Sequence, residues 1–211
     1  MTNGLIDTRN WQRKIMAKHV VITGTGRTGT TFIVQLLTYL GLDTGFSIDN
    51  MPIYRLGRAG LEQDIKKTNA PYIIKAPWFI DHIEEIFMRE DIQIERIFIP
   101  MRDLYAAAES RRYVTRKSKE ANEYTGGGLW DADKPHEQEN VLMMKLYKLI
   151  LDISNTEIPI TLLQYPRLVK DSTYLYDKLK SILNGVSYDK FQTVFKEIIR
   201  PSWIHDFRKE A

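Results

Sequence analysis

A glycine-rich segment near the start of the chain lies between a predicted strand and a predicted helix. Residues 20–22, Val-Val-Ile, favour a buried parallel strand. The segment after them permits a tight turn with inward-pointing N–H groups, because it contains three glycines: Gly24, Gly26 and Gly29. Such a turn at a helix N-terminus forms a cradle for phosphate. The lysine of NTP-hydrolysing loops is absent, and the cation of this loop is Arg27.

Two more strand ends carry cations that could reach the same anion. Lys75 ends an expected strand at residues 71–75, and Arg102 follows one at residues 94–101. Ser110 lies further along the helix expected after Arg102, which rises about 1.5 Å per residue and can bring the hydroxyl back beside the strand tip. An arginine fork with a hydroxyl forms a second phosphate site. Two such sites suit a nucleotide that is phosphorylated at both ends of its ribose.

The elements that must position these residues alternate between strands and helices. Helical spacing of apolar residues and helix-start signals predict helices over these segments: 30–40 (closed by Gly41), 61–67, 79–89, from Asp103 onward, 136–153 and 171–185. A fourth strand is expected at 158–164, and the polar segment 115–135, with glycines at 126–128, is typical of a mobile loop or lid. This order predicts an α/β fold of three layers with a mostly parallel central sheet, which binds ligands beyond the carboxyl ends of its strands.

The bulk composition narrows the class of protein. At 211 residues the chain has the length of one domain, and we expect an N-terminal extension at residues 1–18 and a single α/β domain at 19–211. A net charge of +3 is too small an excess to indicate nucleic acid, which we do not expect as a partner, and the lack of cysteine excludes disulfides, thiolate metal sites and cysteine catalysis. No apolar run approaches the ~20 residues of a membrane span. The expectation is a soluble, cytoplasmic protein.

Four motifs together resemble the sulfotransferase family that uses 3′-phosphoadenosine 5′-phosphosulfate (PAPS). They occur in the family's order and at its strand ends, over about residues 19–185: Gly26-Arg27-Thr28-Gly29-Thr30-Thr31, Lys75-Ala76-Pro77, the pair Arg102 and Ser110, and Tyr165-Pro166-Arg167-Leu168-Val169-Lys170-Asp171. The resemblance implies the P-loop NTPase-like sulfotransferase fold. It also implies transfer of a sulfuryl group from PAPS to a hydroxyl or amine, with PAP (3′-phosphoadenosine 5′-phosphate) as the product.

The resemblance assigns a role to each matching residue. The 5′-phosphosulfate would bind the glycine loop, at Gly26, Arg27, Thr28, Gly29, Thr30 and Thr31. The 3′-phosphate would bind Arg102 and Ser110, and Phe32 and Tyr165 would line the adenine pocket. Arg27 would stabilise the charge on the bridging oxygen as the sulfuryl group leaves, and Lys75 would neutralise the transferring oxygens. No metal is required, because side chains supply the cations.

The base that deprotonates the acceptor is less well defined. Some branches of the family use a carboxylate after the first helix, and Asp49 lies at about that distance from Arg27. Its rivals are Glu62, Asp81 and His82. The family's C-terminal Arg-Lys-Gly motif is missing, and the candidates to replace it are Arg167 and Arg200.

The acceptor carries no sequence signature. A small molecule, a glycan or a lipid would bind between the polar segments 43–69 and 115–135. The basic run from Arg111 to Lys119 is either a solvated helix face or an attraction for an acidic or sulfated acceptor. Two other functions stay open: a P-loop kinase or NTPase with a relocated cation, and a non-catalytic module that binds a nucleotide.

Overall fold

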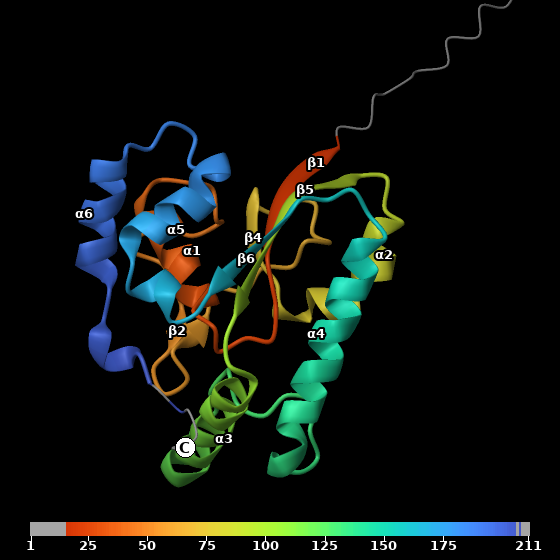
Figure 1. Cartoon of the computed structure of the whole chain (residues 1–211), viewed down its shortest axis with the longest axis vertical. Helices are drawn as coiled ribbons and strands as arrows, with labels where there is room; N and C mark the ends of the chain where they lie inside the picture. The colour runs from red at the N-terminus through yellow and green to blue at the C-terminus, as the bar shows by residue number, and fades with distance from the viewer. Residues whose placement is uncertain (1–15, 206, 208–211) are drawn as a thin grey trace, which may run out of the picture.

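The central feature of the fold is a four-stranded parallel sheet in the order β4-β1-β5-β6 (Figure 1). The computed structural model describes residues 16–205 and residue 207. The strands are β1 (Ala17–Ile22), β4 (Ile73–Lys75), β5 (Ile92–Met101) and β6 (Ile160–Gln164). Their β-branched and aromatic residues suit a sheet that is buried on both faces. The expected α/β fold with a parallel central sheet is therefore confirmed.

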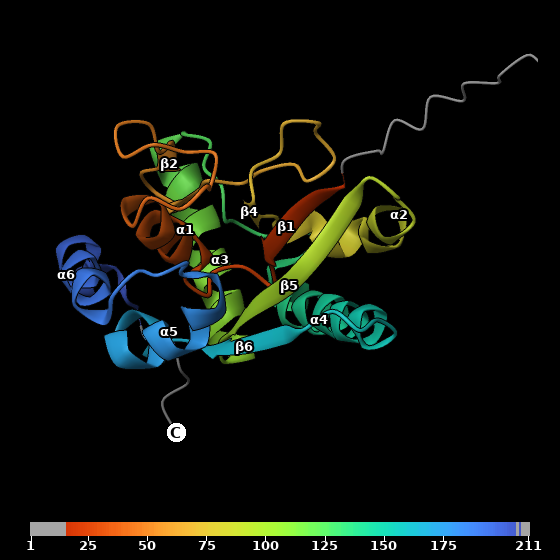
Figure 2. The same cartoon turned by 90° about the horizontal axis from the view of Figure 1, so that it is seen from above.

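Helices cover both faces of the sheet and make three layers (Figures 1 and 2). One face packs against α1 (Thr30–Tyr39), α5 (Ser172–Leu179) and α6 (Tyr188–Ile198). The other face packs against α2 (Ile83–Phe87) and α4 (Gln138–Ser154). The alternation of a strand sends Val20 and Ile22 to the first layer and Val21 to the second. This sandwich fixes the strand ends on which the cations lie.

One long helix, α3 (Leu104–Ala121), lies beyond the carboxyl end of β5 rather than flat on the sheet (Figure 1). It begins at Asp103, whose side chain accepts a hydrogen bond of 2.8 Å from the backbone N–H of Ala106. It ends at Asn122, which adopts the left-handed conformation. The mobile loop expected at 115–135 is therefore wrong at its start, because residues 115–121 belong to this helix.

Several other boundaries differ from expectation. No helix forms at 61–67: Leu61 has a φ of 66°, and the Gln63 N–H bonds the Lys75 carbonyl 2.9 Å away, so this segment runs beside β4. The helix expected at 79–89 is divided at His82 into a 3₁₀ turn (Pro77–Asp81) and α2. β1 begins at Ala17, inside the expected extension, while residues 1–15 lie outside the described part of the chain.

Some elements have no counterpart in the sequence-based prediction. They are α6, the hairpin of β2 (Ile53–Tyr54) and β3 (Ala59–Gly60), and the 3₁₀ turns Arg167–Val169 and Pro201–Trp203. Two further 3₁₀ turns, Pro135–Glu137 and Lys180–Ile182, overlap the helices expected at 136–153 and 171–185. The hairpin and the turn Pro201–Trp203 both border the candidate site. Among the described helices, none has the length and apolar character needed to cross a bilayer.

Candidate functional site

A cavity of about 820 Å³ opens at the edge of the sheet where the four strands end. Most of the residues singled out in the sequence line it: Gly26, Arg27, Gly29, Thr30, Thr31, Phe32, Lys75, Arg102, Ser110 and Tyr165. Thr28 does not; it is fully buried, and its hydroxyl has no hydrogen-bond partner among the described residues. The motifs that are far apart in the sequence therefore meet in one cleft.

The lining is strongly cationic. Among the described residues it includes one carboxylate, Glu62, against seven cationic side chains: Arg27, Arg58, Lys75, Arg102, Arg111, Lys119 and Arg200. Low-dielectric walls strengthen the field of such a cluster and concentrate anions from solution. The cavity is thus electrostatically suited to a ligand with several negative charges.

The glycine loop between β1 and α1 adopts the conformation that its residues allow. Gly26 and Gly29 have φ values of 68° and 87°, and Arg27 between them has a φ of 58°. Gly29 is the N-cap of α1 and provides no side-chain cap for the first N–H groups of the helix. These groups lie at the positive end of the helix dipole, where an anion is favoured.

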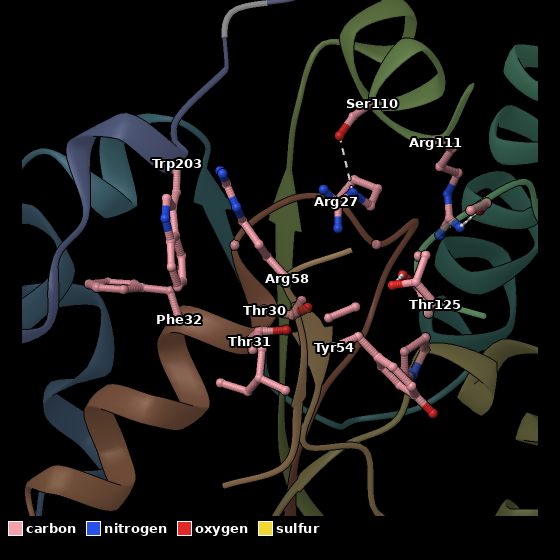
Figure 3. A pocket seen from close by; sticks show the side chains of 18 of the residues that line it. Arg27, Thr30, Thr31, Phe32, Tyr54, Arg58, Ser110, Arg111, Thr125 and Trp203 are labelled. Atoms are coloured by element: carbon pink, nitrogen blue, oxygen red, sulfur yellow. Dashed lines mark hydrogen bonds between the residues drawn. The ribbon is translucent and has the colours of Figure 1, made fainter. Parts of the chain in front are cut away.

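Arg27 points from this loop into the cavity (Figure 3). Its Nε donates a hydrogen bond of 3.0 Å to the Ser110 hydroxyl, and Nη1 donates to the Gly57 carbonyl oxygen. Burial, with the charge of Arg102 nearby, lowers the pKa of Arg27 to about 10. In the described structure this guanidinium bonds a hydroxyl and a carbonyl oxygen. Neither partner carries a negative charge that would compensate its positive charge.

Arg102 ties the end of β5 to the glycine loop. Its Nη1 donates to the Arg27 backbone carbonyl at 2.9 Å, and its Nη2 donates to the His205 carbonyl at 2.6 Å. The guanidinium carbon lies 4.7 Å from the centre of the Tyr165 ring, at cation–π distance. The two arginines that the sequence predicts for one site therefore lie side by side.

Lys75 is almost completely buried, at 3% exposure. Its Nζ donates to Thr31 Oγ1 at 2.9 Å, to the Gly60 carbonyl at 2.6 Å and to Glu62 Oε1 at 2.7 Å. Burial lowers the pKa of Lys75, and the neighbouring Glu62 carboxylate opposes that shift. All three N–H donors of the ammonium are therefore occupied by groups of the chain itself.

The structure separates the candidates for the acceptor's base. Asp49 is exposed and does not line the cavity, so its position gives no support to the expected role. Asp81 pairs with Lys145 at 2.6 Å, and His82 lies 3.4 Å from Glu85, both outside the cavity. Glu62 lines the cavity and touches Lys75. Glu62 is therefore the candidate that the fold brings to the site.

The two candidates for additional phosphate contacts separate in the same way. Arg200 lines the cavity, whereas Arg167 pairs with Asp171 at 3.0 Å and lies outside it. Sequence reasoning missed Arg58, which contacts His205 Nε2 at 3.1 Å and lies 4.9 Å from the Trp203 ring centre. Burial, with Arg58 close by, lowers the pKa of His205. No local pattern marked Arg58, Trp203 or His205, because the hairpin and the C-terminal segment meet only in the folded chain.

The hairpin β2–β3 and the glycine triplet 126–128 enclose Arg27. The Gly57 N–H donates to Thr125 Oγ1 at 2.8 Å, while the Gly57 carbonyl accepts from Arg27. A Cβ on Gly57 would lie 1.9 Å from the Gly126 carbonyl oxygen, so the two segments approach as closely as glycine permits. Gly57 is therefore the residue through which the hairpin contacts the segment 125–128.

The fold and the cavity together define an α/β protein with a cationic site at the carboxyl edge of its sheet. Within residues 16–205 and 207, no group of three or more His, Asp or Glu side chains is placed to hold a metal ion. No protein-family model matches the sequence, and neither a curated protein nor a solved structure matches the chain.

Gly57→Ala should loosen the enclosure around Arg27, because the added methyl group overlaps the Gly126 carbonyl. We expect a loss of about 1–3 kcal/mol in the free energy of unfolding, the usual cost of forcing extra volume into a tight contact. Urea denaturation measures this loss, and limited proteolysis should show faster cleavage within residues 122–134. Lys117→Ala, an exposed change on α3, is the control and should stay within about 0.5 kcal/mol. Equal stability of the Gly57→Ala protein and the wild type would contradict the contact.

Proposed function

We propose that this protein is a sulfotransferase that binds PAPS in the cationic cavity and transfers its sulfuryl group to a hydroxyl or amine acceptor. The observation that carries the proposal is the contact of Arg102 Nη1 with the Arg27 carbonyl at 2.9 Å. Through it a glycine loop at a helix N-terminus and a guanidinium from another strand end share one cavity. This arrangement suits two phosphates on one ribose.

The end of the cavity near Arg102 has the character of a nucleotide pocket. It combines cations with aromatic and apolar side chains: Phe32, Tyr165, Val169, Ile199, Trp203 and Ile204. Adenine has a flat apolar face that such rings can cover, while Arg102 and Ser110 lie within reach of a 3′-phosphate. Phe32 packs edge-on against Phe195 of α6, with ring centres 5.3 Å apart, which fixes this wall.

The transfer step requires charge stabilisation at the bond that breaks. A lone pair of the acceptor oxygen or nitrogen attacks sulfur, the bond from sulfur to the 5′-phosphate oxygen breaks, and its electron pair stays on PAP. Arg27 and Lys75 then stabilise the oxygens on which negative charge develops. We propose that Glu62, rather than Asp49, is the general base that removes the acceptor's proton, because Glu62 lies in the cavity beside Lys75.

Ligand selectivity tests the proposal directly. PAP should bind about tenfold to hundredfold more tightly than AMP, because the 3′-phosphate adds charge-assisted hydrogen bonds. Isothermal titration calorimetry measures both affinities, and Arg102→Ala should remove most of the preference while changing AMP affinity less than about threefold. Equal affinities for PAP and AMP would refute the 3′-phosphate site. Tight binding of Mg-ATP with release of phosphate would favour the kinase or NTPase alternative instead.

Arg27→Ala should lower kcat about 10²- to 10³-fold, the usual effect of removing one preorganised donor from a transition state. The variant should keep the preference for PAP over AMP, because Arg102 is unchanged. Rates are measured as PAP released from PAPS with a panel of alcohols and amines. Arg27→Lys, which keeps the positive charge, is the matched control and should recover part of the activity. A kcat for Arg27→Ala equal to that of the wild type would rule out the mechanism.

Glu62→Gln should lower kcat about 10²- to 10⁴-fold, because the amide cannot accept the acceptor's proton. The affinity for PAP should stay the same or increase, because the change removes a negative charge from the described lining of the cavity. Asp49→Asn tests the expectation from the sequence and should leave kcat within about twofold. The reverse pattern, with Asp49→Asn inactive and Glu62→Gln active, would restore Asp49 as the base. PAP binding without transfer to any acceptor in the wild type would favour the non-catalytic alternative.

A further inference from the structure

The basic run of α3 divides into two groups with opposite surroundings. Arg112 pairs with Glu109 and Glu139 at 2.8 Å, Arg116 pairs with Glu109 at 3.1 Å, and Lys117 pairs with Glu120 at 2.7 Å. None of these three basic residues lines the cavity. Arg111 and Lys119 do line it, and neither forms an ion pair within the described part of the chain. Arg111 is buried and is therefore not explained by a solvated helix face, whereas Lys119 is exposed and lines the cavity.

Arg111 is a buried cation whose hydrogen-bond partners are uncharged. It is 6% exposed, and its hydrogen bonds go to the carbonyl oxygens of Thr25 at 2.6 Å and Gly128 at 2.7 Å. Its Nε has no partner among the described residues. The Asp131 carboxylate, which acts on it at longer range, is bonded to Lys145 at 2.7 Å. A buried charge without a counter-ion is costly unless a ligand completes it.

The position of Arg111 separates it from the nucleotide pocket. Figure 3 shows Arg111 and Arg58 on opposite sides of Arg27, with Trp203 beside Arg58. The Arg111 guanidinium lies 5.0 Å from the Trp130 ring centre and bonds Gly128, so it belongs to the end enclosed by residues 124–130. Lys119 lies eight residues further along α3, a rise of about 12 Å, and lines the same cavity. The two cations therefore mark the end of the cavity away from the adenine.

That end also carries exposed rings. Tyr54 and Tyr124 pack edge-on with ring centres 5.7 Å apart, and they are 43% and 79% exposed. Gly126 lies against Tyr54, since a Cβ there would be 3.0 Å from its ring. A molecule in this end would meet ring edges and faces as well as the two cations. The chemistry is that of an acceptor with a ring-shaped body and a negative group.

We propose that the acceptor carries an anionic oxygen group (sulfate, phosphate or carboxylate) that binds Arg111 and Lys119. This inference rests on the proposed function, because it names the class of acceptor for the same site. It divides the cavity into a nucleotide end around Arg102, a transfer position between Arg27 and Lys75, and an acceptor end around Arg111. An acceptor without the anionic group leaves the buried charge of Arg111 uncompensated and binds more weakly.

The test titrates sodium sulfate into the full chain saturated with PAPS, at constant ionic strength, by isothermal titration calorimetry. PAPS fills the nucleotide and transfer positions, so sulfate is left with the acceptor end. Lys119→Ala should weaken sulfate binding about threefold to fivefold, the upper part of the range for an exposed ion pair. Lys117→Ala removes the same charge from the same helix outside the cavity and should change it less than about twofold. Titrations with phosphate and acetate rank the three anionic groups.

Arg111→Gln should weaken sulfate binding at least about tenfold, because a buried charge-assisted contact is lost. Its fold is checked by its melting temperature, and Lys119→Ala decides the question if this variant does not fold. Sulfate that fails to bind the PAPS-saturated protein, or that binds Lys119→Ala and Lys117→Ala equally, overturns the acceptor subsite and leaves the proposed function intact. Failure of PAPS to bind refutes the proposed function, whereas Lys119-dependent sulfate binding would still support the subsite.

Discussion

The burial of positive charge at the carboxyl edge of the sheet is the constraint on which the other features of this protein depend. Lys75 has one carboxylate partner, whereas Arg27 and Arg111 are held by carbonyl and hydroxyl oxygens. Those oxygens belong to four segments that are distant in the sequence: the hairpin β2–β3, the glycine loop, helix α3 at Ser110, and residues 125–128. The cations therefore order the loops that surround them, and a ligand that neutralises the cations also stabilises the loops.

Periodicity in the sequence predicted the layers of the fold, and tertiary contacts overrode it at residues 61–67. Strands of buried β-branched residues and amphipathic helices follow from local pattern alone, as in β1, α1 and α4. Leu61 and Ile65 have helical spacing, but both are buried in a segment whose Gln63 N–H bonds the neighbouring strand β4. The sequence of one segment does not show a hydrogen bond that the segment forms with a strand elsewhere in the chain.

The strand-end rule predicted more of the site than any individual motif did. Arg27, Lys75 and Arg102 meet because parallel strands end at the same edge, which sequence order already implies. The rule fails for side chains outside regular elements. Distance along the chain favoured Asp49 over Glu62, yet in the irregular stretches before and after the hairpin β2–β3 Asp49 is exposed and Glu62 lines the cavity. In an irregular segment no repeat fixes which way a side chain points.

Consecutive residues of α3 connect the parts of the site. Ser110 accepts a hydrogen bond from the Arg27 side chain, and Arg111 donates to the Thr25 carbonyl in the same glycine loop. Neighbours on a helix point about 100° apart, so one rigid helix can contact the loop from two directions. The N-cap at Asp103 fixes the start of that helix one residue after Arg102. The position of α3 therefore sets the spacing between Arg102 and Arg111, and with it the spacing between the proposed nucleotide end and the proposed acceptor end.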